Sequence, residues 1–195
     1  FQYCPKHFTQ LFTIFGLKNG HYVPLVFVLL PNKESGSYKI TFQAIEEECA
    51  KLDRKFLPTR ITADFEIAIH QAAREVFPKI VIRGCRFHLA QSWYRKIQDL
   101  GLASQYCQRD TEISKYLSYI FGLPFLKPED VGDCFGIELG AIQPTSPSVI
   151  KFADYLVNNY IDENSLFPPE MWAEHSFSME RTTNACESFH SKLNA

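Results

Sequence analysis

Asp64 is the leading candidate for a chemical role in this 195-residue chain. It follows a short apolar run, 58–63, and precedes an amphipathic segment, 65–76. In open α/β sheets ligands collect at the carboxyl ends of strands, so an acid in this place can hold a metal ion. An Asp before a helix is also a favoured N-cap, which stabilises the helix by roughly 0.5–2 kcal/mol relative to Ala. The local pattern alone favours the N-cap, although the two oxygens of one carboxylate allow both roles.

Glu187 is the second candidate acid. It lies on a predicted helix beside an apolar face formed by Cys186, Phe189 and Leu193. Asn184 is three residues away, so it shares a side of the helix with Glu187. A single Glu on a helix is usually part of the solvated surface. The spacing therefore makes Glu187 a candidate and does not assign it a role.

Two Cys/His pairs could bind a metal. Cys85 and His88 form a Cys-x-x-His motif, and Cys186 and His190 are four residues apart. Together they would supply the Cys₂His₂ ligand set of a structural zinc site. The alternative is that Cys85 and His88 pack at the start of their helix, hydrogen-bond locally and help to tie the sheet to an insertion. We favour this structural role over zinc binding.

Nucleic-acid contacts are suggested by only a few residues. Arg95 and Lys96 could meet DNA phosphates, which dominate affinity for DNA, although a solvated helix face explains them as well. Trp172 could stack on an extruded base, but a Trp soon after two prolines is more typical of a core. The net charge of −2 gives no sign of an overall basic face. The chain also lacks a glycine-rich phosphate loop and a Gly-x-Ser-x-Gly nucleophile elbow.

Apolar periodicity predicts the elements that must position these residues. Two apolar runs flank Asn19-Gly20, a hairpin turn signal, and apolar spacings of three and four mark the helices. A hairpin followed by strand–helix–strand units predicts a mixed α/β sheet flanked by helices. No apolar run approaches the roughly 20 residues that cross a membrane, and the scattered cysteines suggest a reduced, intracellular protein. The predicted strands are 9–17, 21–30, 58–63 and 79–83, and the predicted helices are 37–54, 65–76, 86–100, 111–120, 148–160 and one from 183.

Several motifs, in order, resemble those of Mutator-like element (MULE) transposase domains. The similarity spans nearly the whole chain and is weakest from about 105 to 165. Its motifs are Pro5-Lys6 through Ile14, Tyr22-Val23-Pro24-Leu25, Leu30-Pro31-Asn32-Lys33, Asp64-Phe65-Glu66, Phe77-Pro78, Gly84-Cys85-Arg86-Phe87-His88-Leu89-Ala90-Gln91, Arg95-Lys96 through Leu102, Met171-Trp172, Arg181-Thr182-Thr183-Asn184, Glu187, His190 and Leu193-Asn194.

The resemblance implies an RNase H-like fold and the chemistry of DDE transposases. It implies that Asp64 is the second catalytic acid and Glu187 the third, holding Mg²⁺ or Mn²⁺ in a site that cleaves and joins DNA. Three carboxylates can hold two divalent ions about 3.5–4 Å apart. The implied division is an RNase H-like core at 1–100, a helical insertion and linker at 101–180, and the start of the C-terminal core helix at 181–195. This resemblance reverses the preference for an N-cap at Asp64.

The chain departs from the family pattern at its start. The first acid of the family would lie just before Phe1, and residues 1–33 contain no Asp or Glu. We therefore expect a fragment, truncated at both ends, that does not cleave DNA by itself. The intact protein is expected to be a nuclear DNA transposase that could form homo-oligomers, with no membrane association and no small-molecule cofactor. The alternatives are a domesticated, non-catalytic DNA- or protein-binding module and an unrelated α/β domain.

Overall fold

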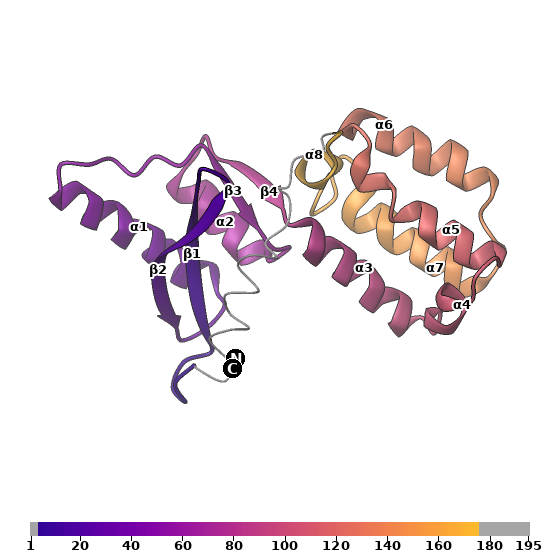
Figure 1. Ribbon diagram of the computed structural model, residues 1–195, viewed down its shortest axis with the longest axis horizontal. Helices are drawn as coiled ribbons and strands as arrows, with labels where there is room; N and C mark the ends of the chain where they lie inside the picture. The colour runs from indigo at the N-terminus through magenta and orange to yellow at the C-terminus, as the bar shows by residue number, and fades with distance from the viewer. Residues whose placement is uncertain (1–3, 176–195) are drawn as a thin grey trace. The chain divides into compact units, whose positions relative to one another are not determined.

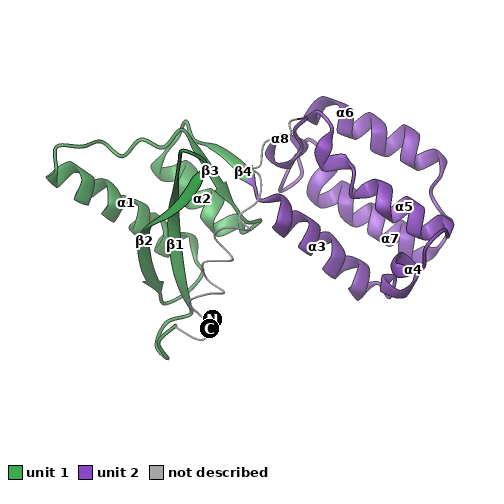
Figure 2. Cartoon of the chain, in the orientation of Figure 1, with its two compact units in different colours: residues 1–83, 180–195 green, residues 84–179 purple. Residues whose placement is uncertain are grey.

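The computed structural model describes residues 4–175, and the chain forms two compact units (Figures 1 and 2). Unit 1 comprises residues 1–83 and 180–195, and unit 2 comprises residues 84–179. The described residues contain two two-stranded sheets and eight α-helices, so the predicted mixed α/β class is confirmed. Within the described residues the strands form two small sheets rather than the single mixed sheet expected from the sequence, since neither β1 nor β2 pairs with β3 or β4.

The first sheet is an antiparallel hairpin of β1 (Gln10–Lys18) and β2 (His21–Leu30). Asn19 and Gly20 connect the strands with positive φ angles of 53° and 75°, so the predicted turn is confirmed. The pairing is irregular near Phe15, which lies opposite Pro24, a residue without a backbone N–H. The side chain of Leu25 lies close to Gly16, where a Cβ would be 2.7 Å from Leu25 Cδ1.

The second sheet is a strand–helix–strand unit. It consists of β3 (Arg60–Ala63), α2 (Ile67–Val76) and β4 (Val81–Gly84). The Val81 N–H donates to the Thr59 carbonyl at 3.0 Å, so the two strands start side by side, as in a parallel pair joined by a crossover helix. The predicted unit is therefore present. Both strands start two residues later than predicted.

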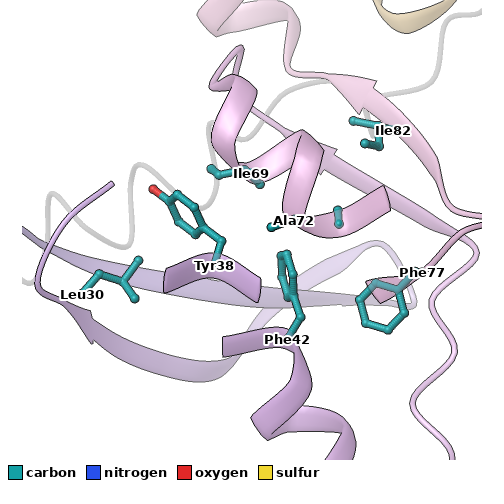
Figure 3. Packing of buried hydrophobic residues seen from close by; sticks show 8 residues of the cluster. Leu30, Tyr38, Phe42, Ile69, Ala72, Phe77 and Ile82 are labelled. Atoms are coloured by element: carbon teal, nitrogen blue, oxygen red, sulfur yellow. The ribbon is translucent and has the colours of Figure 1, made fainter. Parts of the chain in front are cut away.

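Helix α1 (Ser35–Lys51) packs with α2 to build the core of unit 1. Figure 3 shows Tyr38 and Phe42 of α1 directed toward α2; both are buried. The apolar stripe predicted on α1 extends further than the core does, because Cys49 is half-buried and Leu52, just after the helix, is 74% exposed. Only the first half of α1 therefore anchors the unit. The buried cluster comprises Leu30, Tyr38, Phe42, Ile69, Ala72, Ala73, Phe77 and Ile82.

All regular elements of unit 2 after β4 are helices among the described residues, and the buried Trp93 is at the centre of their core. Trp93 is fully buried and packs edge-to-face on Tyr160 and Trp172, with ring centres 5.7 and 5.5 Å away. Trp172 is buried, so its core interpretation is confirmed, and its Nε1–H donates to the Phe167 carbonyl at 2.9 Å. The elements are α3 (Arg86–Asp99), α4 (Ala103–Cys107), α5 (Glu112–Ile120), a 3₁₀ turn (Leu123–Phe125), α6 (Pro128–Asp133) with a π-helical continuation (Cys134–Leu139), α7 (Pro147–Leu156) with a second one (Val157–Ile161), and α8 (Pro169–Trp172).

Helix α3 belongs to compact unit 2, which begins at Gly84. The expected division into a core at 1–100, an insertion and linker at 101–180 and the last helix at 181–195 stays a prediction. Among residues 4–175, no helix is both long and apolar enough to cross a membrane.

Candidate functional site

Asp64 occupies the first position after β3, at the carboxyl end of that strand. The helix that follows begins at Ile67, and its N-cap is Glu66, which has extended backbone angles and no capping side-chain hydrogen bond. The Glu66 carbonyl accepts from the N–H groups of Ile69 and His70 at 3.1 and 3.4 Å. Asp64 thus lies two residues before the cap, and its interpretation as the N-cap is wrong. Its side chain is available for another role.

One oxygen of the Asp64 carboxylate is buried and makes no hydrogen bond. The residue as a whole is half-buried, and this oxygen is Oδ1. An unsatisfied buried polar atom costs about 1–3 kcal/mol, and more when the group is charged. A hard divalent cation would satisfy such an oxygen, since Mg²⁺ prefers carboxylate ligands and keeps several waters. Within residues 4–175, no three Asp, Glu, His or Cys side chains gather to hold a metal ion.

The second acid of this turn, Glu66, is fully engaged. Tyr38 of α1 donates its hydroxyl to Glu66 Oε1 at 2.6 Å, and Lys33 Nζ lies 3.7 Å from Glu66 Oε2. Gln10 of β1 donates from Nε2 to the Tyr38 hydroxyl. Burial, reinforced by the hydrogen bond to Glu66, raises the pKa of Tyr38, so this hydroxyl stays protonated and donates to the carboxylate. Glu66 is therefore an anchor that joins α1 to the start of α2.

His70 is the residue of this site that sequence reasoning missed. It is 2% exposed on α2, and its Nε2 lies 2.7 Å from the backbone carbonyl of Asp64. A carbonyl oxygen can only accept, so Nε2 carries the proton. Burial, more than any other influence, lowers the pKa of His70 and favours the neutral ring. The only signal available in the sequence was a His six residues after an acid, which has no specific meaning by itself.

The remaining candidates are placed as follows. Cys85 is the fully buried N-cap residue of α3, and His88 is half-buried in its first turn. Arg95 is exposed, whereas Lys96 Nζ lies 5.1 Å from the centre of the Tyr155 ring, a cation–π distance. Structural and phosphate-binding roles for these residues stay predictions. Asn184, Glu187 and His190 lie outside the described residues.

The fold and this site define a mixed α/β protein in which an acid at the end of a strand has one buried carboxylate oxygen without a hydrogen-bond partner. The family follows from comparison with known proteins. Residues 4–92 match the model of the MULE transposase domain. The predicted resemblance to a Mutator-like element transposase domain is therefore confirmed over that stretch, which includes Asp64, Glu66, His70, Cys85 and His88. No match was found among curated proteins or solved structures.

Proposed function

We propose that this chain is part of a MULE-type transposase whose intact form cleaves transposon ends and joins them to target DNA. In this proposal the fold is RNase H-like, and Asp64 and Glu187 are two of three carboxylates that hold Mg²⁺ or Mn²⁺. The observation that carries it is Asp64 Oδ1, a buried and unpartnered carboxylate oxygen at the end of β3 in the stretch that matches the family.

The contribution of this chain is to hold the acid in place. Asp64 offers Oδ1 from the end of β3, and its backbone carbonyl is held by His70 of α2. Glu187 would supply a second oxygen ligand from the predicted last helix. When bound, divalent ions polarise the scissile phosphate and lower the pKa of the attacking water or 3′-hydroxyl. Because few protein carboxylates suffice for Mg²⁺, the acids need only a fixed position and ionised oxygens.

DNA is the proposed partner of the intact protein, and the nucleus is its proposed location. Arg95 is an exposed cation on α3 that could meet a phosphate, and Lys96 would have to exchange its contact with Tyr155 for one. Cys85 and His88 are proposed to stabilise the start of α3 without zinc. Assembly into a homo-oligomer belongs to the same proposal. Catalysis is proposed for the intact protein, since only two of the three carboxylates can be assigned in this chain.

Strand cleavage by the intact protein is the decisive measurement. Asp64→Asn keeps the shape of the side chain and removes its charge, so we expect magnesium-dependent cleavage of transposon-end DNA to fall to background. Asp99→Asn, at the exposed end of α3, is the matched control and should leave cleavage unchanged. Undiminished cleavage by the Asp64→Asn protein would refute the proposed site. An intact protein that binds DNA and never cleaves it would support the alternative, a non-catalytic binding module.

A further inference from the structure

We infer that His70 and Tyr38 are positioning residues for Asp64: they fix the turn between β3 and α2 so that Asp64 Oδ1 stays available to a divalent cation. The inference rests on the proposed function, since it takes Asp64 to be a metal ligand. It adds two residues whose side chains would act through other groups and not by ligation.

His70 holds the turn from within α2. Its Nε2–H donates to the Asp64 carbonyl at 2.7 Å, while its own backbone N–H lies 3.4 Å from the Glu66 carbonyl. One residue therefore binds the backbone of the turn at both of its acids. His70 is 2% exposed, so water cannot readily replace the ring as a donor. Without the ring, the Asp64 carbonyl would lose its partner in a partly buried position.

Tyr38 holds the other end of the same turn. Its hydroxyl donates to Glu66 Oε1 at 2.6 Å and accepts from Gln10, so the contact joins β1, α1 and the start of α2. Tyr38 is itself fully buried, and its ring packs against Phe12 with centres 5.2 Å apart. A hydroxyl fixed in this way leaves little freedom to the Glu66 side chain.

The contrast between the two acids is the central observation. Both oxygens of Glu66 face donors, Tyr38 and Lys33, whereas Asp64 Oδ1 is buried and faces none. A turn needed only for folding would gain stability by pairing its buried carboxylate, because unpaired buried charge is costly. A metal-ligand site requires a fixed backbone and a carboxylate oxygen without another partner. The turn has both, because Glu66 and the Asp64 backbone are held while Asp64 Oδ1 makes no hydrogen bond. Mutation of a residue that hydrogen-bonds to a metal ligand typically lowers metal affinity by about 10–100-fold.

The experiment uses the 195-residue chain and Mn²⁺, whose paramagnetism broadens amide NMR signals close to a bound ion. Broadening of residues 61–66 reports on Asp64, and broadening around the exposed Asp162 measures weak surface binding. We expect His70→Leu to raise the Mn²⁺ concentration for half-broadening of residues 61–66 by about tenfold. His70→Gln should restore it, since the Gln amide nitrogen can occupy the position of Nε2. Tyr38→Phe, which keeps the ring and removes the hydroxyl, should weaken binding in the same direction.

The Asp64→Asn control and a measurement of folding separate the outcomes. Asp64→Asn must abolish the broadening at 61–66; if it does not, the proposed function fails at its metal ligand. If Asp64→Asn abolishes it while folded His70→Leu and Tyr38→Phe bind Mn²⁺ normally, the positioning inference is overturned and the proposed function stands. A merely structural role would lower the thermal midpoint and leave the Mn²⁺ response of the folded protein unchanged. Should His70→Leu fail to fold, the His70→Gln and Tyr38→Phe chains decide the question.

Discussion

The turn between β3 and α2 depends on interactions of single side chains. The fully buried Tyr38 hydroxyl and the His70 imidazole both contact this turn, although they come from different helices. Tyr38 must keep its proton to donate to Glu66, whereas the His70 Nε2–H can donate to the Asp64 carbonyl from either the neutral or the protonated ring. Burial favours the uncharged form of both residues, since it raises the pKa of Tyr38 and lowers that of His70. Two buried side chains, Tyr38 and His70, therefore hold this turn from within the core, and the exposed Lys33 adds an ion pair to Glu66.

The lowered pKa of His70 predicts how stability depends on pH. Burial lowers this pKa below its ordinary value of 6.5; nearby Arg74 lowers it further, while the Asp64 carbonyl and carboxylate oppose the shift. Below pH 6.5 the unfolded chain therefore binds more protons at His70 than the folded protein does. The contribution of His70 to the stability of the folded protein is complete above pH 6.5 and is lost as the pH falls toward the pKa of His70 in the folded protein. We expect a slope of at most about 1.4 kcal/mol per pH unit from this single group. Urea unfolding, followed by circular dichroism at about pH 7.5 and about pH 5.5, measures it.

His70→Gln is the control for this prediction. Gln keeps a donor at the same place and does not titrate, so the difference in unfolding free energy between the two pH values should shrink. An equal pH dependence in both proteins would show that His70 is not its source.

At the scale of elements, the sequence predicted those whose signals are local. The Asn19-Gly20 turn and helix α2 follow from residues that are neighbours in the chain. The contact between Tyr38 and Glu66 joins residues 28 positions apart, and the apolar stripe of α1 made Tyr38 look like an ordinary core residue. Where Asp64 stands relative to the helix start was also misjudged, because Asp64 and Glu66 are both reasonable caps by residue type. Local patterns thus identified the acid, while tertiary packing determined what holds it.

Two glycines of unit 2 allow a prediction about its helices. A Cβ on Gly122, just after α5, would lie 2.9 Å from the Tyr119 carbonyl oxygen, whereas one on Gly132 of α6 would meet nothing within 4 Å. Gly122→Ala should therefore destabilise by about 1–3 kcal/mol, because backbone must move. Gly132→Ala, the matched control, should stabilise by about 0.5–1 kcal/mol through helix propensity. Urea unfolding followed by tryptophan fluorescence measures both, and a stabilising Gly122→Ala would contradict the close approach of this position to the Tyr119 carbonyl.

The whole molecule combines a family-matched part and a helical part. The matched stretch, 4–92, covers the described residues of unit 1 and ends inside α3, so most of unit 2 lies outside it. This agrees with the sequence, in which the family resemblance is weakest from about 105 to 165. Each unit also has its own core: aromatic and aliphatic side chains around Tyr38 and Phe42 in unit 1, and the rings around Trp93 in unit 2. Separate cores allow one unit to carry the other without rebuilding its own interior.

Separate cores predict separate responses to mutation. Both tryptophans of the chain, Trp93 and Trp172, lie in unit 2, so tryptophan fluorescence reports on that unit alone. Phe42→Ala, at a side chain 2% exposed in unit 1, should destabilise unit 1 by about 3–5 kcal/mol and barely move the fluorescence transition in urea. Leu117→Ala, at a fully buried side chain of unit 2, should destabilise by about 2–5 kcal/mol and shift that transition directly. Amide hydrogen exchange of α1 and α2 provides the complementary reading, rising for Phe42→Ala and unchanged for Leu117→Ala. Equal shifts of the fluorescence transition in the two variants would mean that the units unfold as one.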